Sequence, residues 1–143
     1  MRTMKDKVFG FLLNKQVKLC ALATATKDDQ PWNAIMGYAV QEDLTIVLST
    51  HKGSRKYSNL QQNSKVALVF GWEFSGLNVQ CDGEARIIEE GEEYKKTEKF
   101  FFTQNPHAAK FKNSDTIFIK IMPKCMRVTD FNTQPPSVEE QTL

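Results

Sequence analysis

Alternating apolar and polar positions recur along most of the chain and predict a protein built mainly from β-strands. Six segments carry this alternation or a short apolar, β-branched run: residues 17–27, 32–40, 44–50, 65–70, 77–88 and 116–128. The first three are joined by short polar turns, which is typical of an antiparallel meander. The fifth contains Asp82-Gly83, where we expect a bulge or kink, and Pro123 restricts the sixth to a sheet edge or a bulge.

Helical spacing of apolar residues appears in further segments. Residues 4–15 predict a short amphipathic helix that lays one face on a core. A second helix is expected after Ser54, a typical N-cap residue, and a third over residues 89–103, ending before Pro106. Six strands with a few covering helices predict a mainly β protein that forms a small antiparallel barrel.

The length of 143 residues suits a single domain and leaves little room for a second core. A hydrophobic content of 41% and a charged content of 25% are those of an ordinary globular protein. We expect one domain over residues 1–130. Residues 131–143 are polar and contain two consecutive prolines, so we expect them to form an arm or to be partly disordered.

Charge and cysteine content exclude several classes of function. A formal net charge of +2 gives no electrostatic footprint for nucleic acid. No apolar run is long enough to cross a bilayer, and the N-terminal stretch lacks the features of a secretory signal. Neither histidine has metal-ligand spacing, and Cys20 and Cys81 lie in apolar strands as expected of buried, unreactive thiols. We therefore expect a reduced, cytoplasmic protein with no structural metal, no membrane segment and no nucleic-acid partner.

The clearest candidate for ligand binding is the stretch STHKGSRK, residues 49–56. It joins a strand to a helix N-terminus, where exposed N–H groups and the helix dipole favour an anion. Thr50 and Ser54 can add hydroxyl donors, while Arg55 and Lys56 can add positive charge. In the simpler alternative, Ser54 only caps the helix and the two cations form a solvated first turn.

Other residues are compatible with a flat ligand, each with a purely structural alternative. Trp32, Tyr38 and Trp72 can stack on a ring, although such aromatics more often belong to a core or an interface. Asn78 offers the donor and acceptor that a heterocycle requires, or it is an ordinary strand residue. The chain has no P-loop, no GxGxxG and no nucleophile elbow, so these routes to function are unsupported.

Three stretches, taken in this order, carry a resemblance to a known family: ALATATKDDQPW, LTIVLSTHKGSRKYSNLQQNSKVALVFGW and LNVQCDGEARII. The order resembles that of the pyridoxamine 5'-phosphate oxidase-like FMN-binding split barrels, from about residue 17 to residue 88, with looser similarity beyond. Gly-Ser-Arg-Lys followed by a helix and then Asn-x-x-Val-Ala-Leu-Val is more specific in combination than any one piece.

The resemblance implies a six-stranded antiparallel split β-barrel and a homodimer with FMN at the subunit interface. It assigns the flavin phosphate to the Gly53-Ser54-Arg55-Lys56 helix N-terminus, and the flavin itself to a neighbouring strand backbone and a strand-end amide. The cofactor-binding residues that it implies are Ala34, Ile35, Met36, Gly37, Ser49, Thr50, Ser54, Arg55, Lys56 and Asn78.

Two departures from the vitamin-forming oxidases affect what the resemblance implies. Ala34 and Ala39 stand where those enzymes carry an Arg and a Lys, so two cationic contacts to FMN are absent. The chain also ends FNTQPPSVEEQTL, without the basic, aromatic segment that binds the pyridoxal substrate. The resemblance therefore implies the cofactor rather than the oxidation of pyridoxamine phosphate.

The main hypothesis is an FMN-dependent oxidoreductase of unknown substrate, with no catalytic acid or base assigned and His51 as a candidate proton donor. A flavin-binding electron carrier or sensor and a haem-handling barrel are the alternatives. A barrel that has no cofactor and serves as an interaction module is the third hypothesis. Reduction of bound flavin by a nicotinamide cofactor separates an enzyme from a carrier, and haem has its own absorption band.

Overall fold

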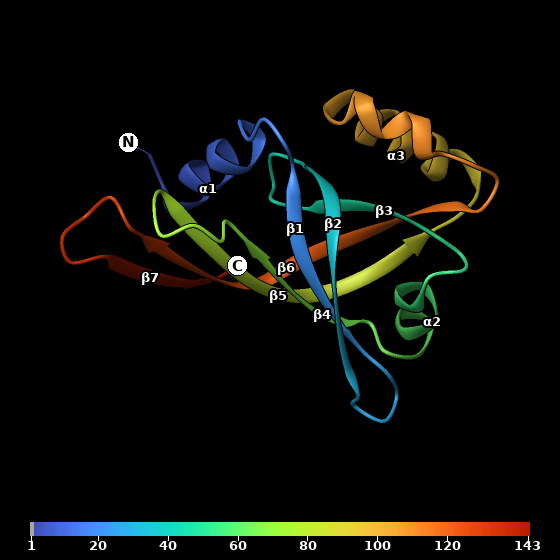
Figure 1. The fold of residues 1–143 in the computed structure, drawn as a ribbon, viewed down its shortest axis with the longest axis horizontal. Coiled ribbons are helices and arrows are strands. Elements are labelled where there is room, and N and C mark those ends of the chain that lie inside the picture. The colour runs from blue at the N-terminus through green and yellow to red at the C-terminus, as the bar shows by residue number, and fades with distance from the viewer. Residues whose placement is uncertain (1) are drawn as a thin grey trace.

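Six strands close into an antiparallel barrel in the computed structural model, which describes residues 2–143. The barrel strands are β1 (Leu19–Ala25), β2 (Pro31–Val40), β3 (Ile46–His51), β4 (Lys65–Phe70), β5 (Leu77–Ile88) and β6 (Thr116–Asp130), and β7 (Ser137–Thr142) is added at the edge. Neighbours pair in the order β3-β2-β1-β4-β5-β6-β7, and β6 also pairs with β3 (Figure 1). The predicted mainly β, six-stranded antiparallel barrel is therefore confirmed, with β7 as one extra strand.

Alternation along each strand fills the barrel interior. In β4, Val66, Leu68 and Phe70 are buried, whereas Lys65 and Ala67 are exposed. Successive side chains of a strand point to opposite faces, so one row enters the core and the other remains on the outer surface. The outward row of the strands is consequently free to form binding surfaces.

The predicted bulge lies between β5 and β6. Asp82 pairs with Cys125 but the next residue, Gly83, pairs with Pro123, so Lys124 is the extra residue. A Cβ atom on Gly83 would lie 2.4 Å from a backbone carbonyl oxygen of β6, which explains why a glycine occupies this close approach. Both expectations, a bulge at Asp82-Gly83 and a proline confined to it, are confirmed.

Helix α1 (Met4–Leu13) packs on the barrel with the apolar face that its spacing predicts. Thr3 and Asp6 form a reciprocal capping box at its start, which satisfies N–H groups that have no intrahelical partner. Its buried side chains are Met4, Val8 and Leu12, and they belong to the same apolar cluster as the barrel interior. The hydroxyl of Tyr38 also donates a 2.7 Å hydrogen bond to a carbonyl of the last helical turn.

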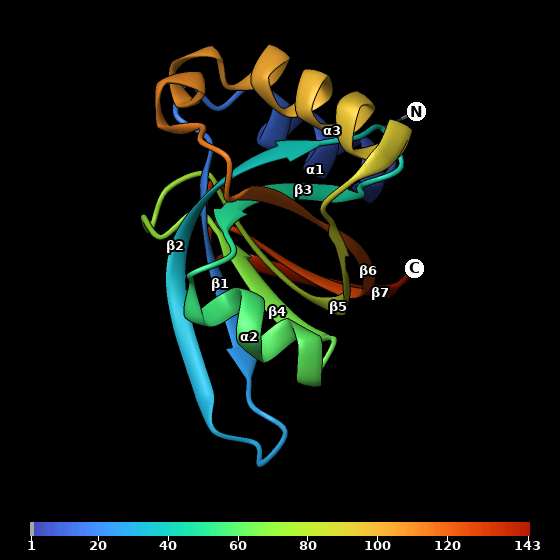
Figure 2. The same cartoon turned by 90° about the vertical axis from the view of Figure 1, so that its right-hand side faces the viewer.

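Helix α3 (Gly91–Gln104) and the 3₁₀ helix η1 (Pro106–Phe111) cover part of the outer surface, over β2, β3 and β6 (Figure 2). A second apolar cluster joins them to β2, β3, β5 and β6: Ala39, Val47, Ile88, Phe101 and Phe118. The amide of Gln104 donates to and accepts from the backbone of Val40, at 2.9 and 3.0 Å. Helix α3 ends before Pro106, as the sequence predicts.

The C-terminal tail contains a strand that the sequence does not predict. β7 pairs with β6 from Cys125 to Asp130, and all six of its side chains are exposed. Because no side chain of β7 enters a core, its sequence shows no apolar alternation, and it is placed mainly by backbone pairing with β6. The division into a domain over residues 1–130 and an arm over 131–143 stays a prediction.

Within residues 2–143, no helix has both the length and the apolar character needed to cross a membrane.

Candidate functional site

A cavity of about 300 Å³ opens at the start of helix α2 (Arg55–Gln62), between β2, the end of β3 and the segment formed by α3 and η1. Six of the ten residues predicted to bind a cofactor line it: Ile35, Met36, Gly37, Ser49, Thr50 and Lys56. These residues come from three elements that are separated along the chain, and the barrel brings them to one place.

The turn after β3 positions the first residues of α2. Ser54 is the N-cap, and its Oγ accepts a 3.3 Å hydrogen bond from the backbone N–H of Tyr57. The hydroxyl of Thr50 donates to the same oxygen at 3.2 Å, and the N–H of Ser54 donates to the carbonyl of His51 at 3.0 Å. The N–H groups of Arg55 and Lys56, which start α2, have no intrahelical acceptor, so they remain available to an anion.

Two lysines, Lys56 and Lys112, line this cavity, and Lys56 is the one at the start of α2. Its side chain is partly buried, and desolvation lowers the pKa of its ammonium group. Among the residues that the structure describes, no carboxylate lies within ion-pair distance of it. A bound anion would compensate the desolvated charge, so Lys56 supports an anion at the start of α2.

Arg55, predicted as the second phosphate contact, is placed differently. Its side chain is exposed, and its guanidinium carbon lies 3.5 Å from the ring centroid of Trp32. This cation–π contact ties the start of α2 to the start of β2. Arg55 does not line the cavity, so a contact with a phosphate there requires its side chain to turn away from Trp32.

Strand β2 forms one wall of the cavity. Ile35 is 60% exposed on the outer surface, whereas Met36 is buried in the barrel interior. Ala34 is partly buried and lies outside the cavity lining. Ala39, which stands where the resemblance implies a lysine, is fully buried and packs in the cluster of Phe101. That position therefore has no space for a long cationic side chain.

The segment formed by α3 and η1 supplies cavity residues that the sequence did not predict. They are Phe101, Phe102, Ala108, Phe111 and the adjacent Lys112. The ammonium of Lys112 is paired with the carboxylate of Glu98 at 2.5 Å. Three consecutive phenylalanines, residues 100–102, were the available signal, because consecutive helical positions cannot all face one core.

His51, the candidate proton donor, also lines the cavity. Its Nδ1 atom is buried, and no hydrogen-bond partner for it lies within residues 2–143. A buried polar atom without a partner is costly, so a ligand atom at this nitrogen would be stabilising.

Asn78 is not brought to this cavity. It lies on β5 opposite Thr129, and its amide donates a hydrogen bond to the carbonyl of Gly71, at the start of the loop between β4 and β5. Within one chain, Asn78 is a structural residue of that loop.

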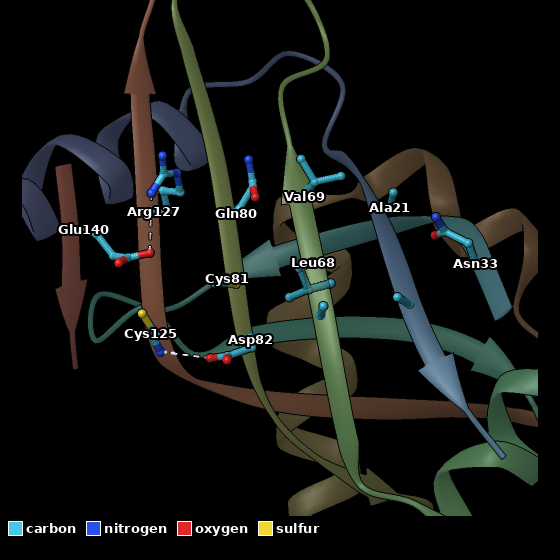
Figure 3. Close-up of a pocket in the computed structure, with 12 residues that line it drawn as sticks. Ala21, Asn33, Leu68, Val69, Gln80, Cys81, Asp82, Cys125, Arg127 and Glu140 are labelled. Atoms are coloured by element: carbon cyan, nitrogen blue, oxygen red, sulfur yellow. Dashed lines mark hydrogen bonds and ion pairs between the residues drawn. The ribbon is translucent and has the colours of Figure 1, made fainter. Parts of the chain in front are cut away.

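A second hollow, of about 410 Å³, lies on the outer face of β1, β4, β5 and β6 (Figure 3). Small apolar side chains of β1 and β4 line it: Ala21, Ala23, Ala67 and Val69. Its charged groups already have partners, since Arg127 lies 3.7 Å from Glu140 and Asp82 accepts a 3.1 Å hydrogen bond from the N–H of Cys125. The hollow therefore has room for another surface, but its charged groups are not free to bind a ligand.

The buried cysteines Cys20 and Cys81 behave as predicted. Burial raises the pKa of each thiol to about 12, so neither carries a thiolate at neutral pH. Neither thiol is therefore available as a nucleophile.

Comparison with known proteins gives one family. The family model described as pyridoxamine 5'-phosphate oxidase matches residues 4–129. Among curated proteins, the chain is 28% identical over 78 residues to the dihydrophenazinedicarboxylate synthase of Burkholderia lata. That alignment covers 54% of this chain and 37% of the relative, so this chain matches little more than a third of the relative's length.

Solved structures share the fold at low identity. A heme binding protein from Mycobacterium smegmatis superposes with a TM-score of 0.76 and 16% identity, covering 99% of this chain and 59% of that one. An FMN binding protein from Nostoc punctiforme, related to pyridoxamine 5'-phosphate oxidase, superposes with a TM-score of 0.70 and 9% identity. In that case 95% of this chain and 93% of the other are covered.

Proposed function

Because this chain belongs to the pyridoxamine 5'-phosphate oxidase family, we propose that it binds FMN and acts as an oxidoreductase. The observation that carries the proposal is the convergence of β2, the end of β3 and the start of α2 on one cavity whose half-buried lysine has no carboxylate partner among residues 2–143. A structural neighbour that is an FMN binding protein supports the same cofactor.

The residues at the start of α2 fit a phosphate. Lys56 provides the facing charge, the first N–H groups of the helix provide donors, and the hydroxyl of Ser54 is free to donate because its oxygen already accepts two hydrogen bonds. Arg55 adds a second cation when it leaves Trp32. Helix dipole, hydrogen bonds and charge then favour the same ligand group.

The remaining cavity fits the flavin ring. The backbone at Ile35 and Gly37 forms one side, and Phe102 and Phe111 form an aromatic wall on the other. FMN, when bound, supplies hydride or single-electron transfer, and the protein supplies binding, orientation and exclusion of water. His51 also lines this space, where its imidazole can donate or accept a hydrogen bond.

We propose that the working form is a homodimer with FMN between the two copies. The alanines of the second hollow leave room for a second chain to approach the strands closely, and the charges around it are already paired. Ile35 remains 60% exposed beside the cavity, and a second copy would cover it. In its own chain Asn78 does not line the cavity, but in a dimer it could contact the flavin of the other copy.

Oxidation of pyridoxamine phosphate is not part of the proposal. Ala34 and Ala39 provide no cation, and the burial of Ala39 under α3 closes the position where one would be needed. The substrate of the Burkholderia relative is not carried over either, since the similarity covers 37% of that protein. A flavin-binding electron carrier or sensor would use the same FMN site but would not convert a substrate.

A second candidate function, haem handling, is favoured by one observation. His51 lines the cavity, and histidine is the most common protein ligand of haem iron. The structural neighbour from Mycobacterium smegmatis is a heme binding protein. Titration with haem would then produce a Soret band that disappears in His51→Ala, with no retention of FMN.

The experiment that tests the FMN proposal compares FMN with riboflavin, which has the same ring and no phosphate. Purified protein is titrated with each compound, desalted, and its flavin spectrum recorded. We expect FMN to be retained with perturbed bands and riboflavin to be lost. Equal retention of both compounds would contradict the phosphate site, and retention of neither would contradict the cofactor. Reduction of the bound FMN by NADH or NADPH then separates an oxidoreductase from a carrier.

A further inference from the structure

Lys112 is a cationic side chain of the candidate cavity, and it stands apart from the start of α2. It follows η1 and lines the cavity from the segment formed by α3 and η1. Its side chain is 43% exposed, and its ammonium is paired with the carboxylate of Glu98 on α3. The hydrogen bond to Glu98 raises the pKa of Lys112 above its usual value, so the ammonium is charged throughout the neutral range. The cavity therefore has a permanent positive charge on a second wall.

The backbone places Lys112 beside the turn that precedes α2. Strand β6 begins at Thr116, which pairs with His51 at the end of β3. One residue further along the turn, the N–H of Lys52 donates a 3.0 Å hydrogen bond to the carbonyl of Asp115. The segment that joins η1 to β6, orange in Figure 2, therefore runs alongside the turn that leads into α2, on the same side of the barrel. Lys112 thus lies toward the end of the cavity where the phosphate is proposed to bind.

A phosphate monoester carries more negative charge than the start of α2 compensates. Such a group has a charge of about −1.5 to −2 at neutral pH. Lys56 supplies one positive charge, and the helix dipole adds the equivalent of about half a charge. Arg55, the other cation of the same turn, lies over the ring of Trp32 and outside the cavity lining. Lys112 is a cation of the lining that can compensate the rest without moving from its wall.

The ion pair with Glu98 leaves Lys112 able to bind a second anion. An ammonium group has three N–H donors, and one of them suffices for the carboxylate. The side chain of Glu98 is only 26% exposed, so it holds the ammonium at the cavity wall and offsets its charge while no anion is bound. With a phosphate in the cavity, the ammonium stands between the carboxylate and the phosphate and has donors for both.

We propose that Lys112 binds the FMN phosphate from the wall formed by α3 and η1, together with Lys56 and the first N–H groups of α2. This inference rests on the proposed FMN site. Glu98 is a positioning residue, since it contacts Lys112 and not the cofactor. Lys112 compensates for the absence of a cation on β2, where Ala34 and Ala39 provide none. Bound phosphate thereby connects the end of η1 to the start of α2.

The test compares the equilibrium affinities of the full chain for FMN and for riboflavin, which differ only in the phosphate. Lys112→Met keeps an aliphatic stem and removes the charge. We expect it to weaken FMN binding about tenfold and to leave riboflavin binding unchanged, as measured by flavin titration. Lys112→Arg keeps the charge and should bind FMN within a few-fold of the unmutated protein. An equal loss of both affinities in Lys112→Met, or no loss for FMN, would overturn the inference, because Lys112 would then only support the cavity wall or face solvent.

The matched control is Lys110→Met, at an exposed lysine of η1 that lies over the ring of Phe111 and outside the cavity lining. It removes the same charge two residues away and so measures the effect of net charge alone. We expect both affinities of this variant to stay unchanged. A loss of FMN affinity as large as that of Lys112→Met would contradict a direct contact. An unmutated protein that binds neither flavin, or binds both equally, would instead refute the proposed FMN site, so the two failures are distinguishable.

Discussion

The two hollows on the surface of this barrel differ in the state of their polar groups. The cavity at the start of α2 holds a desolvated lysine and an unpaired histidine nitrogen, neither with a partner among residues 2–143. The hollow on the outer face is larger, at about 410 Å³ against about 300 Å³, but its charges are paired and three alanines line it.

Volume alone therefore does not identify a ligand site in this molecule. Unsatisfied, partly buried polar groups are unfavourable without a ligand, so they indicate where a small anionic ligand binds. Small side chains with satisfied polar neighbours have no such need, and they suit the close approach of another chain.

The largest effect is expected from a charge placed in the outer hollow. Ala67→Glu puts a carboxylate in its lining, and burying an unpaired charge in an interface costs about 3–5 kcal/mol. We expect the dimer to dissociate at micromolar concentration and FMN affinity to fall with it, as measured by sedimentation velocity and flavin titration. The matched control is Gln61→Glu, on an exposed position of α2, and it should leave both unchanged. A dimeric Ala67→Glu protein would show that the second copy binds elsewhere.

The next effect separates the two cations of the phosphate site. Lys56→Ala should weaken FMN binding roughly tenfold to a hundredfold, because a hydrogen bond to a charged group contributes about 1.5–3 kcal/mol. Arg55→Ala should have the smaller effect, since Arg55 stacks on Trp32 and does not line the cavity. Lys52→Ala, an exposed lysine of the same turn, is the control. If Arg55→Ala were the more damaging variant, the guanidinium would be the main phosphate contact.

These expectations show how far the sequence leads. Alternation predicted six strands and their barrel, and Asp82-Gly83 with Pro123 predicted the bulge, because each has a local physical cause. The strand β7 was missed since its side chains never enter a core. Of the candidate site, the residues on β2, β3 and α2 could be placed together through the resemblance.

Other parts of the site could not be predicted because they depend on tertiary contacts. The turn of Arg55 toward Trp32 needs the relative position of α2 and β2, which are far apart along the chain. The aromatic wall from Phe102 to Phe111 needs the placement of α3 over β2 and β3. Asn78 does not reach the cavity of its own chain, so a role in flavin binding would require a second copy. The sequence alone does not position that second copy.

A pH dependence of smaller size should follow from Lys56. Burial lowers its pKa below the usual 10.5, and a bound phosphate raises that pKa again, so the protonated form binds FMN more tightly. Affinity should therefore fall as the pH rises through the pKa of the free protein, by at most about tenfold per pH unit. Lys56→Arg keeps its charge at every accessible pH and should remove the dependence without removing binding. An equally steep dependence in Lys56→Arg would assign it to another group, such as the flavin.

The smallest effect is expected at the one ion pair that borders the outer hollow. Arg127 and Glu140 lie 3.7 Å apart, and their side chains are 49% and 57% exposed, so solvent screens their attraction. Exposed pairs of this kind contribute about 0.2–1 kcal/mol, and Arg127→Ala should lower the free energy of unfolding by no more than that in urea denaturation. The same variant should leave FMN affinity unchanged, because Arg127 and Glu140 pair with each other and do not line the cavity at the start of α2. A larger loss of unfolding free energy, or dissociation of the dimer, would mean that Arg127 contacts the second copy. The outer hollow would then bind that copy through a charged group as well as through its fit.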